Sequence, residues 1–459
     1  MQKKAQKSKN RKKKISLDQD WPLINPNAAG VDLGFREHWV AIPQGRDEQS
    51  VRRFGTFTSD LEAMADWLEK CGITSVAMEA TGVYWIPLFQ LLERRGFKVL
   101  LVNARQIKNV SGRKSDISDC QWIQRLHAYG LLGGSFRPAD PYCVVRSYLR
   151  YRDELVAARS TQTQHMQKAL QQMNVQLKQV LSDINGLSGL AIIGAILQGE
   201  RNPIRLAGMA DRRVKSSDRE IAKALIGDYR AEHLFQLKSA FELYHTYEAK
   251  IEACDQALAQ ELEKLPDRVD VLAKPLPATI GRKKIHEALR LGLYRKLGVD
   301  LTAVESIGGL VALTVLTEVG PDLSLFKTEK HFTSWLGLCP DNRISGGKVL
   351  SCRTRRVVNR LSDALRLAAT TLEHSQTALG AYYRRMKARL GAAEGITAMA
   401  HKLARIIYRL LKHGEEYVRE GMADYEKKYR ERKLKMLQNT AASFGFELVQ
   451  KQTLAQGVS

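Results

Sequence analysis

Two aspartates spaced three residues apart, Asp116 and Asp119, are the first residues whose types and spacing suggest chemistry. They fall at the expected start of a helix, just after the basic pair Arg113 and Lys114. Residues three apart share one face of an α-helix, so these carboxylates repel each other unless a proton, a cation or a metal ion lies between them. The structural alternative is that Asp116 is the helix N-cap and Asp119 lies in the first turn, where the helix dipole favours negative charge.

Two further acids, Asp32 and Glu79, precede this pair at the ends of expected strands. Strand alternation places Asp32 on the opposite side from the apolar Val31 and Leu33, and Glu79 ends an otherwise apolar strand. Burying an unpaired carboxylate costs several kcal/mol, so acids on neighbouring strands are either solvated at the strand ends or joined by a cation. Four acids at one sheet edge suit Mg²⁺, and a pair of such ions stabilises the attacking and departing oxygens in phosphodiester chemistry.

A basic segment without acids surrounds Ser345. Read alone, Ser345 is a loop serine beside glycines, which is typical of a turn. The cations around it suit phosphate binding and the stabilisation of charge that develops on a reacting phosphate. The alternative to phosphate binding is that these cations simply form a solvated face of a helix. Between residues 343 and 362 these cations are Arg343, Lys348, Arg353, Arg355, Arg356 and Arg360.

The elements that must position the acids alternate between strands and helices from residue 27 to about residue 138. A hairpin followed by alternating strand and helix units predicts an α/β domain with a mixed sheet covered by helices. The expected strands are 29–34, 39–42, 51–57, 75–80 and 98–103, and the expected helices are 61–69, 85–94 and one that begins at Asp116.

The chain beyond residue 144 has helical periodicity. Apolar residues from Met166 to Ile184, and again from Leu237 to Leu258, step by three and four, which predicts two long helices that pack as a coiled coil and could carry a dimer interface. The C-terminal part is expected to be mainly helical and basic, and Ser306 to Gly309 resembles the turn of a helix-hairpin-helix.

These patterns divide the chain into six expected segments. They are a basic disordered arm (1–26), an α/β domain (27–140), coiled-coil helices (141–270) with a helical insertion at about 186–225, a linker (271–300), a helical C-terminal domain (301–437) and a tail (438–459).

Composition indicates a partner and a compartment. The 459 residues hold 72 Lys and Arg against 49 Asp and Glu, a net charge of +23, so the surface should attract a polyanion, by default a nucleic acid. The six cysteines form no C-x-x-C pair, which suits a reducing cytoplasm. The N-terminus lacks the apolar core of a secretory signal, and no apolar run is long enough to span a membrane.

The order of the acidic motifs resembles a known family. Gly30-Val-Asp, Met78-Glu-Ala-Thr-Gly, Val102-Asn-Ala-Arg-Gln and Lys114-Ser-Asp-x-x-Asp119 resemble the N-terminal RuvC-like (ribonuclease H-fold) domain of the DEDD transposases, insertion-sequence family one-hundred-and-ten. The resemblance implies that Asp32, Glu79, Asp116 and Asp119 bind Mg²⁺. Ser115 stands where the family often has Thr.

A second group of motifs resembles the C-terminal transposase domain of the same family. They begin at Glu305 (Glu-Ser-Ile-Gly-Gly-Leu), Phe332 (Phe-Thr-Ser-Trp-Leu-Gly-Leu-Cys-Pro) and Ile344 (Ile-Ser-Gly-Gly-Lys). By this resemblance Ser345 is the nucleophile and meets the acids of another protomer. The resemblance also implies a structured bridge RNA that pairs with target and donor DNA, and dimers that join into tetramers.

The sequence therefore predicts a bacterial transposase or DNA recombinase, cytoplasmic and associated with the nucleoid, that uses a phosphoserine intermediate and Mg²⁺. One alternative makes Tyr382 or Tyr383 the nucleophile, near Arg384, Arg385 and His401. Another is an actin-like or sugar-kinase-type ATPase, because Gly30-Val-Asp-Leu-Gly also opens such enzymes. A third is a protein that binds RNA or DNA junctions without catalysis.

Overall fold

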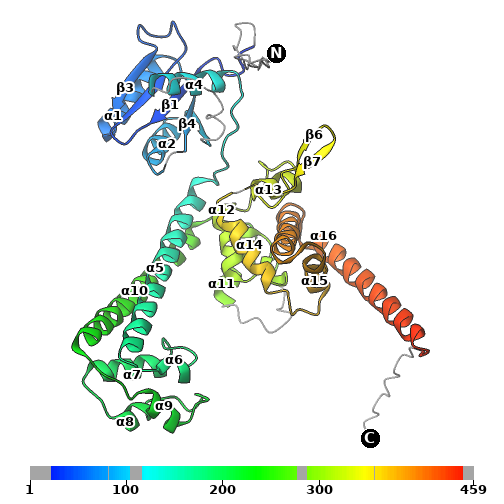
Figure 1. The fold of residues 1–459 in the computed structure, drawn as a ribbon. Coiled ribbons are helices and arrows are strands. Elements are labelled where there is room, and N and C mark those ends of the chain that lie inside the picture. Colours follow the sequence, from blue (N-terminus) through cyan, green and yellow to red (C-terminus); the bar gives the residue numbers. More distant parts are fainter. Residues whose placement is uncertain (1–21, 81, 104–115, 277–286, 356, 448–459) are drawn as a thin grey trace, which may run out of the picture. The chain divides into compact units, whose positions relative to one another are not determined.

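The computed structural model describes residues 22–80, 82–103, 116–276, 287–355 and 357–447 (Figure 1). The chain folds as two units that divide between Phe136 and Arg137. The predicted basic arm lies almost entirely outside the described residues. None of the described helices combines the length and apolar character needed to span a membrane.

The first unit is a five-stranded mixed sheet with the strand order β3-β2-β1-β4-β5, which confirms the predicted mixed α/β domain. β1 pairs in parallel with β4, and β4 with β5, whereas β2 runs antiparallel to both of its neighbours. The elements are β1 (Ala28–Leu33), β2 (Glu37–Ala41), β3 (Val51–Gly55), α1 (Thr58–Lys70), β4 (Ser75–Glu79), α2 (Trp85–Arg94), β5 (Lys98–Val102) and α4 (Asp116–Ala128).

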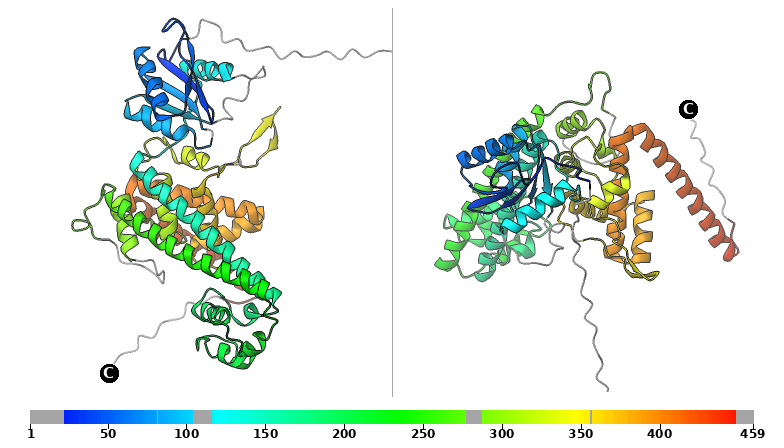
Figure 2. Two further views of the ribbon diagram at one scale, coloured as in Figure 1. Left: turned by 90° about the vertical axis from the view of Figure 1, so that its left-hand side faces the viewer. Right: turned by 90° about the horizontal axis from the view of Figure 1, so that it is seen from above.

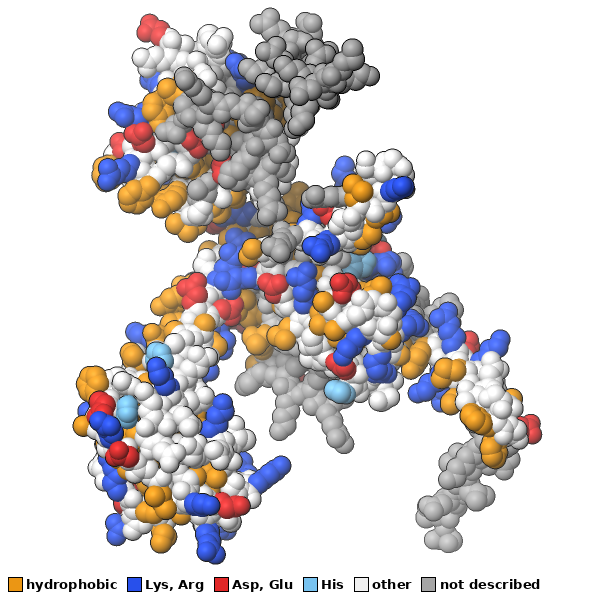
Figure 3. Space-filling view, viewed as in Figure 1, with side chains coloured by type: hydrophobic (Ala, Val, Ile, Leu, Met, Phe, Trp, Pro, Cys, Tyr) orange, Lys and Arg blue, Asp and Glu red, His pale blue; other side chains and the backbone are white. Residues whose placement is uncertain are grey.

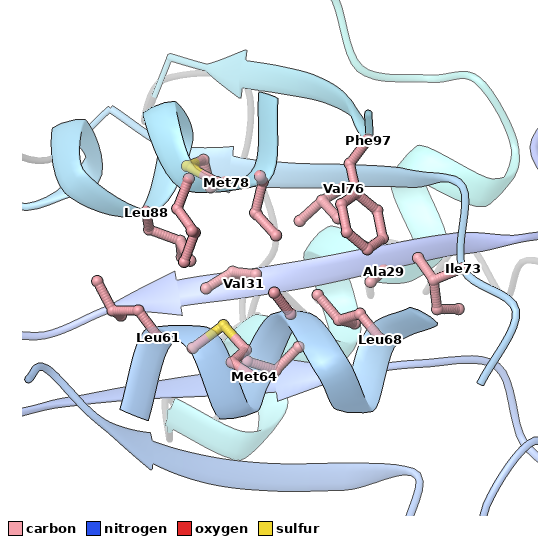
Figure 4. Packing of buried hydrophobic residues seen from close by; sticks show 14 of the residues in the cluster. Ala29, Val31, Leu61, Met64, Leu68, Ile73, Val76, Met78, Leu88 and Phe97 are labelled. Carbon is pink, nitrogen blue, oxygen red and sulfur yellow. The ribbon is translucent and has the colours of Figure 1, made fainter. Parts of the chain in front are cut away.

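Alternating residues of the central strands belong to two separate hydrophobic cores, one on each face of the sheet. Val31 and Met78 point to one face, where Met64 of α1 and Leu88 of α2 cover them (Figure 4). The neighbouring residue Ala77 belongs to the opposite face, in a cluster with residues of β5 and α4. Helices therefore cover both faces, which is why the central strands read as continuous apolar runs.

The boundary between β3 and α1 differs from the prediction. The strand ends at Gly55 and the helix begins at Thr58, whereas the sequence predicted a strand to residue 57 and a helix from residue 61. The reason is a local cap: the backbone N–H of Phe57 donates to Asp60 Oδ2 at 3.2 Å, which starts the helix one turn earlier.

Two long antiparallel helices, α5 (Asp140–Gln172) and α10 (Ala231–Lys264), begin the second unit and pack side by side (Figure 2). Four short helices join their far ends: α6 (Leu177–Val180), α7 (Leu187–Leu197), α8 (Pro203–Ala207) and α9 (Asp218–Ala224). The prediction of one continuous helix through Ile184 is wrong. Asn174 has a φ of 55°, a left-handed conformation that ends a helix, and Leu177 and Ile184 then turn into the core of the short helices.

The remaining elements build a helical body with one hairpin. They are α11 (Glu287–Leu297), η1 (Leu301–Ala303), α12 (Gly309–Glu318), α13 (Glu329–Trp335), β6 (Arg343–Ser345), β7 (Lys348–Ser351), α14 (Arg360–Thr370), α15 (Ala378–Leu390) and α16 (Ala392–Ser443), with a break in α16 at Gly414.

Helices extend into two of the expected segments of this region. The expected linker over 271–300 contains α11, whose apolar face is hard to see in the sequence because it also buries Arg290 and Lys296. Arg290 pairs with Asp300 at 2.5 Å, and Lys296 donates to the carbonyl oxygens of Glu263 and Leu265 at the end of α10. The expected tail from residue 438 is helical to Ser443, because α16 continues without a further break.

Helix α4 crosses β1 at Gly30, and this contact leaves no room for a side chain. A Cβ atom at Gly30 would lie 2.2 Å from the backbone nitrogen of Gln124 and 2.5 Å from the carbonyl oxygen of Cys120. Both atoms belong to the backbone of α4, so no side chain can move to relieve the clash. The glycine thus fixes the distance between the helix and the strand.

We expect Gly30→Ala to push α4 away from β1 and to lower the free energy of unfolding by about 1–3 kcal/mol or more. Chemical denaturation followed by circular dichroism measures this change. Gly292→Ala is the matched control, because nothing lies within 4 Å of its added Cβ and it occupies the interior of α11. Equal stability of the two variants would contradict the close contact at Gly30.

Candidate functional site

Asp32 and Glu79 come next to each other at the carboxyl ends of two parallel strands. Val31 is the partner of Met78 in the β1–β4 register, and the two acids are the residues that follow this pair. Neighbouring strands lie about 4.8 Å apart, so the two acids project from adjacent backbone positions. Both side chains are half-buried, in contrast to the fully buried Val31 and Met78.

Helix α4 brings its N-terminal turn to the same end of β1. The carbonyl oxygen of Ala128, at the end of the helix, accepts from the backbone N–H of Asn25, and Gln124 Nε2 donates to the Ala28 oxygen. Cys120 lies one turn further, against Gly30. The helix therefore runs antiparallel to β1, and its first turn, which begins at Asp116, faces the part of the strand that carries Asp32.

Nearby acids contribute to a raised pKa of the Cys120 thiol. Burial is the main cause that raises its pKa to about 12, and the negative charges of Asp32 and Asp119 add to this effect. Asp32 and Asp119, which are 87 positions apart in the sequence, thus both act electrostatically on one buried thiol. This agrees with the backbone placement of α4 over β1.

The backbone places Asp32 and Glu79 on adjacent strand ends and Asp119 on α4, the helix that packs against these two strands. Among the described side chains, no group of three or more His, Cys, Asp or Glu is close enough to hold a metal ion. The side chain of Asp116 lies outside the described part, as do Arg113 and Lys114, so the complete set of four is not tested.

The same end of the sheet carries two exposed aromatic residues that the sequence analysis missed. Phe35 follows β1 and Tyr84 follows β4, and their rings meet edge to face with centroids 5.9 Å apart. Their signal in the sequence is their position, because each comes within five residues of a candidate acid.

Ser345 lies on a β-hairpin, whereas the sequence predicted a loop in a helical domain. It is the last residue of β6 and pairs with Lys348, the first residue of β7. The two residues between them, Gly346 and Gly347, have φ values of 56° and 76°. Positive φ at both central positions is the requirement of a tight type I′ turn, so the two glycines place Ser345 beside the tip of the hairpin.

The hairpin has two chemically different faces. Ser345 and Lys348 form one cross-strand pair, and Ile344 and Val349 form the adjacent pair, which points to the opposite face. Ser345 and Lys348 are exposed, and Ile344 and Val349 expose 61% and 58% of their surface. A serine hydroxyl and an ammonium group thus share a face that nothing within the described structure covers.

Hydrogen bonds or an ion pair engage part of the predicted set of cations. Arg355 donates to the carbonyl oxygen and the hydroxyl of Ser334 at 2.7 and 2.8 Å, and Arg360 pairs with Asp153 of α5 at 2.8 Å. Lys348 and Arg353 form no ion pair with any residue that the structure describes. The side chain of Arg343 and all of Arg356 lie outside the described part.

The acids of the surrounding helices are largely occupied by arginines of the same unit. Glu318 of α12 accepts two hydrogen bonds from Arg150 Nη2, at 2.7 and 2.9 Å, and Glu329 of α13 pairs with Arg405 and Arg409 of α16. On the visible face in Figure 3, Lys and Arg side chains are spread more widely over this unit than Asp and Glu. The excess positive charge therefore remains available for a polyanion.

The tyrosine alternative receives no support from the burial of these side chains. Tyr383 is 1% exposed, packed between α15 and α16, so its hydroxyl has no access to a DNA strand. Tyr382 is half-buried, and its ring lies against the ammonium group of Lys402 at 4.6 Å from the centroid. Burial lowers the pKa of His401, which keeps the imidazole neutral at physiological pH.

Comparisons with known proteins identify the class to which this fold and these residues belong. The profile of the DEDD transposases of IS110 elements, described as "Transposase", matches residues 29–175, which include all four candidate acids. A second profile, described as "Transposase IS116/IS110/IS902 family", matches residues 300–384, which include Ser345 and the cations around it. The two profiles occur in the order in which the sequence motifs predicted them.

The chain belongs to the IS110 family of transposases, as its two domains show. It is also similar to a protein of Sinorhizobium fredii (strain NBRC 101917 / NGR234) named "Putative transposase y4pF/y4sB", with 32% identity over 127 residues. This match covers 26% of the present chain and 32% of the relative, so the chain spans about a third of the length of the curated relative it matches.

The environment of Cys120 leads to a test of the packing around the acids. We expect iodoacetamide at pH 8 to modify the exposed Cys352 and to leave Cys120 intact, because Cys120 is buried and its raised pKa keeps it protonated. Mass spectrometry of the alkylated protein measures both sites. Modification of Cys120 at a rate comparable to that of Cys352 in the folded protein would contradict the placement of α4 against β1.

Proposed function

We propose that this protein is a transposase that cuts and rejoins DNA through a phosphoserine intermediate. Ser345 Oγ attacks a phosphodiester phosphorus, the bond from phosphorus to one DNA oxygen breaks, and that oxygen leaves with a proton. A DNA hydroxyl then attacks the phosphoserine, which releases Ser345 and joins the strands. The observation that carries this proposal is the exposed Ser345 at the tip of a hairpin, paired with Lys348 in a segment without acids.

The cations of this segment have a role in the same reaction. Lys348 and Arg353 are exposed, and the ammonium group of Lys348 lies on the hairpin face that carries the serine. Positive charge at this position attracts the DNA backbone and stabilises the additional negative charge of a pentavalent phosphorus. Arg355 and Arg360 contribute by holding the hairpin and α14 through the contacts with Ser334 and Asp153.

The second part of the proposal concerns Mg²⁺ and the four acids. The donor set is chemically suitable, because Asp32, Glu79, Asp116 and Asp119 supply carboxylate oxygens, the ligands that Mg²⁺ prefers. When bound, Mg²⁺ supplies Lewis-acid stabilisation of the reacting phosphate oxygens. The strand order, with β1, β3, β4 and β5 running in one direction and β2 in the other, supports a RuvC-like, ribonuclease H-type fold for this domain.

The proposed partners are donor and target DNA and a guide RNA of the bridge type. The net charge of +23 supports a polyanion of considerable size. The long pair α5 and α10 offers a surface for a coiled-coil dimer, and two dimers would join into the active tetramer. The proposed place of action is the bacterial cytoplasm at the nucleoid, where the DNA substrate is found.

We expect Ser345→Ala to remove covalent protein–DNA adducts, with a loss on the order of 10³-fold or more, because no other hydroxyl replaces a missing nucleophile. Nucleic-acid binding should stay within twofold. Denaturing gels with labelled DNA measure the adducts. Ser351→Ala is the matched control, because Ser351 lies on the same hairpin, at the far end of β7. Unchanged adduct yield in Ser345→Ala would overturn the assignment of the nucleophile.

We expect Asp119→Asn and Glu79→Gln each to reduce Mg²⁺-dependent strand cleavage more than about 100-fold, because each change removes a negatively charged oxygen ligand. Titrating MgCl₂ against the cleavage rate measures both the maximum and the midpoint. Asp66→Asn is the control, since Asp66 lies on the surface of α1 in an exposed ion pair with Arg95. A normal Mg²⁺ titration in the two variants, or an equal loss in the control, would argue against a metal site at the sheet edge.

A further inference from the structure

Phe35 and Tyr84 form an exposed aromatic pair at the end of the sheet that carries Asp32 and Glu79. Phe35 exposes 71% of its surface and Tyr84 exposes 41%. Their rings contact each other edge to face, with an interplanar angle of 69°. Neither residue belongs to the apolar core of the unit, so within the described residues the pair does not contribute to core packing.

The local backbone fixes where these rings lie. Phe35 occupies the tight turn between β1 and β2, closed by a hydrogen bond of 3.0 Å from the Gly34 N–H to the Glu37 oxygen. Tyr84 is the N-cap residue of α2, and its ring lies over Gly82, whose φ of 54° turns the chain after β4. Because β1 and β4 are parallel, the loops after them meet at one edge, where α/β proteins place their ligands.

The neighbouring residues suit a nucleic acid better than a protein. Arg36, next to Phe35, is exposed and forms no ion pair within the described structure. An aromatic ring stacks on any nucleobase, because every base has a π-face, while an adjacent cation holds the phosphate. A protein partner would favour an apolar surface without this cation and without half-buried carboxylates beside it.

We propose that Phe35 and Tyr84 form a platform for an unpaired nucleobase next to the phosphate on which the acids act. The inference rests on the proposed function and specifies its substrate: DNA that is locally unpaired at the reacting position. A base stacked inside a duplex offers the rings only its edge, so the platform holds a base that has left the stack. Strand separation by a pairing guide RNA would supply such a base.

Stacking on this platform positions the DNA without reading its sequence. Contacts between aromatic side chains and bases tolerate all four bases. The platform therefore selects unpaired DNA over duplex DNA, and base pairing with the guide RNA selects the sequence. In this account Phe35 and Tyr84 are positioning residues, and they take part in no bond change.

The test measures binding of two DNA probes by the full-length protein in EDTA, so that no cleavage occurs. One probe is a duplex, and the other has the same sequence with a short unpaired stretch that contains 2-aminopurine, whose fluorescence falls when it stacks on an aromatic ring. Phe35→Ala and Tyr84→Ala should each weaken binding of the unpaired probe about tenfold and restore the fluorescence. Binding of the duplex should stay within twofold.

Three further variants complete the experiment. Tyr84→Phe should bind as the wild type does, since it keeps the ring. Phe35→Leu should lose the quenching while it keeps an apolar side chain, which covers the case that Phe35→Ala folds poorly. Phe57→Ala is the matched control, because Phe57 exposes 78% of its surface in the same unit but follows β3, two strands from β1.

The results separate this inference from the proposed function. The platform proposal is wrong if the wild type does not quench 2-aminopurine, or if both probes lose affinity equally in the alanine variants. It is equally wrong if Phe57→Ala weakens binding of the unpaired probe as much as Phe35→Ala and Tyr84→Ala do. It is also wrong if the alanine variants change the oligomeric state in place of DNA binding, because the rings would then form a protein interface. Adducts that persist in Ser345→Ala would overturn the nucleophile and would leave the binding result unaffected.

Discussion

The contact between α4 and β1 at Gly30 is the constraint on which the acidic site depends. Backbone atoms of Cys120 and Gln124 approach so closely that only hydrogen fits at this position. This brings the start of α4 to the carboxyl end of β1, so acids from a strand and from a helix can serve one site. A larger residue at position 30 would separate the two elements and weaken the site without touching any acid.

The two units carry opposite kinds of chemistry. In the first unit, half-buried carboxylates collect at the end of parallel strands, a costly arrangement that a divalent cation would stabilise. In the second, a hairpin presents a serine with a cation across the strand, while helix acids such as Glu318 and Glu329 are neutralised by arginines. The proposed reaction uses both parts, because acids alone repel a phosphodiester and a serine alone is a weak nucleophile.

The sheet could be predicted from the sequence because its strands are short apolar runs that alternate with helices. The strand positions of Asp32 and Glu79 could be predicted as well, since these acids interrupt or end the apolar runs. The hairpin of Ser345 could not be predicted, because β6 has only three residues and the apolar residues Ile344 and Val349 of the hairpin are exposed. No buried face therefore marks the two strands in the sequence.

Helix α11 could not be predicted for the opposite reason, since its buried face contains the charged residues Arg290 and Lys296. The aromatic pair of Phe35 and Tyr84 needed the register of β1 and β4 to be recognised.

The proposed metal site requires that acids far apart in the sequence hold one divalent cation. The most direct measurement replaces Mg²⁺ by Fe²⁺ and maps the backbone cuts that Fe²⁺ makes in the presence of ascorbate and peroxide, since such cuts occur only close to the bound ion. We expect cuts near residues 32, 79 and 116–119, and we expect excess Mg²⁺ to suppress them and Asp32→Asn to abolish them. Cuts elsewhere, or cuts that Mg²⁺ does not suppress, would contradict the proposed metal site.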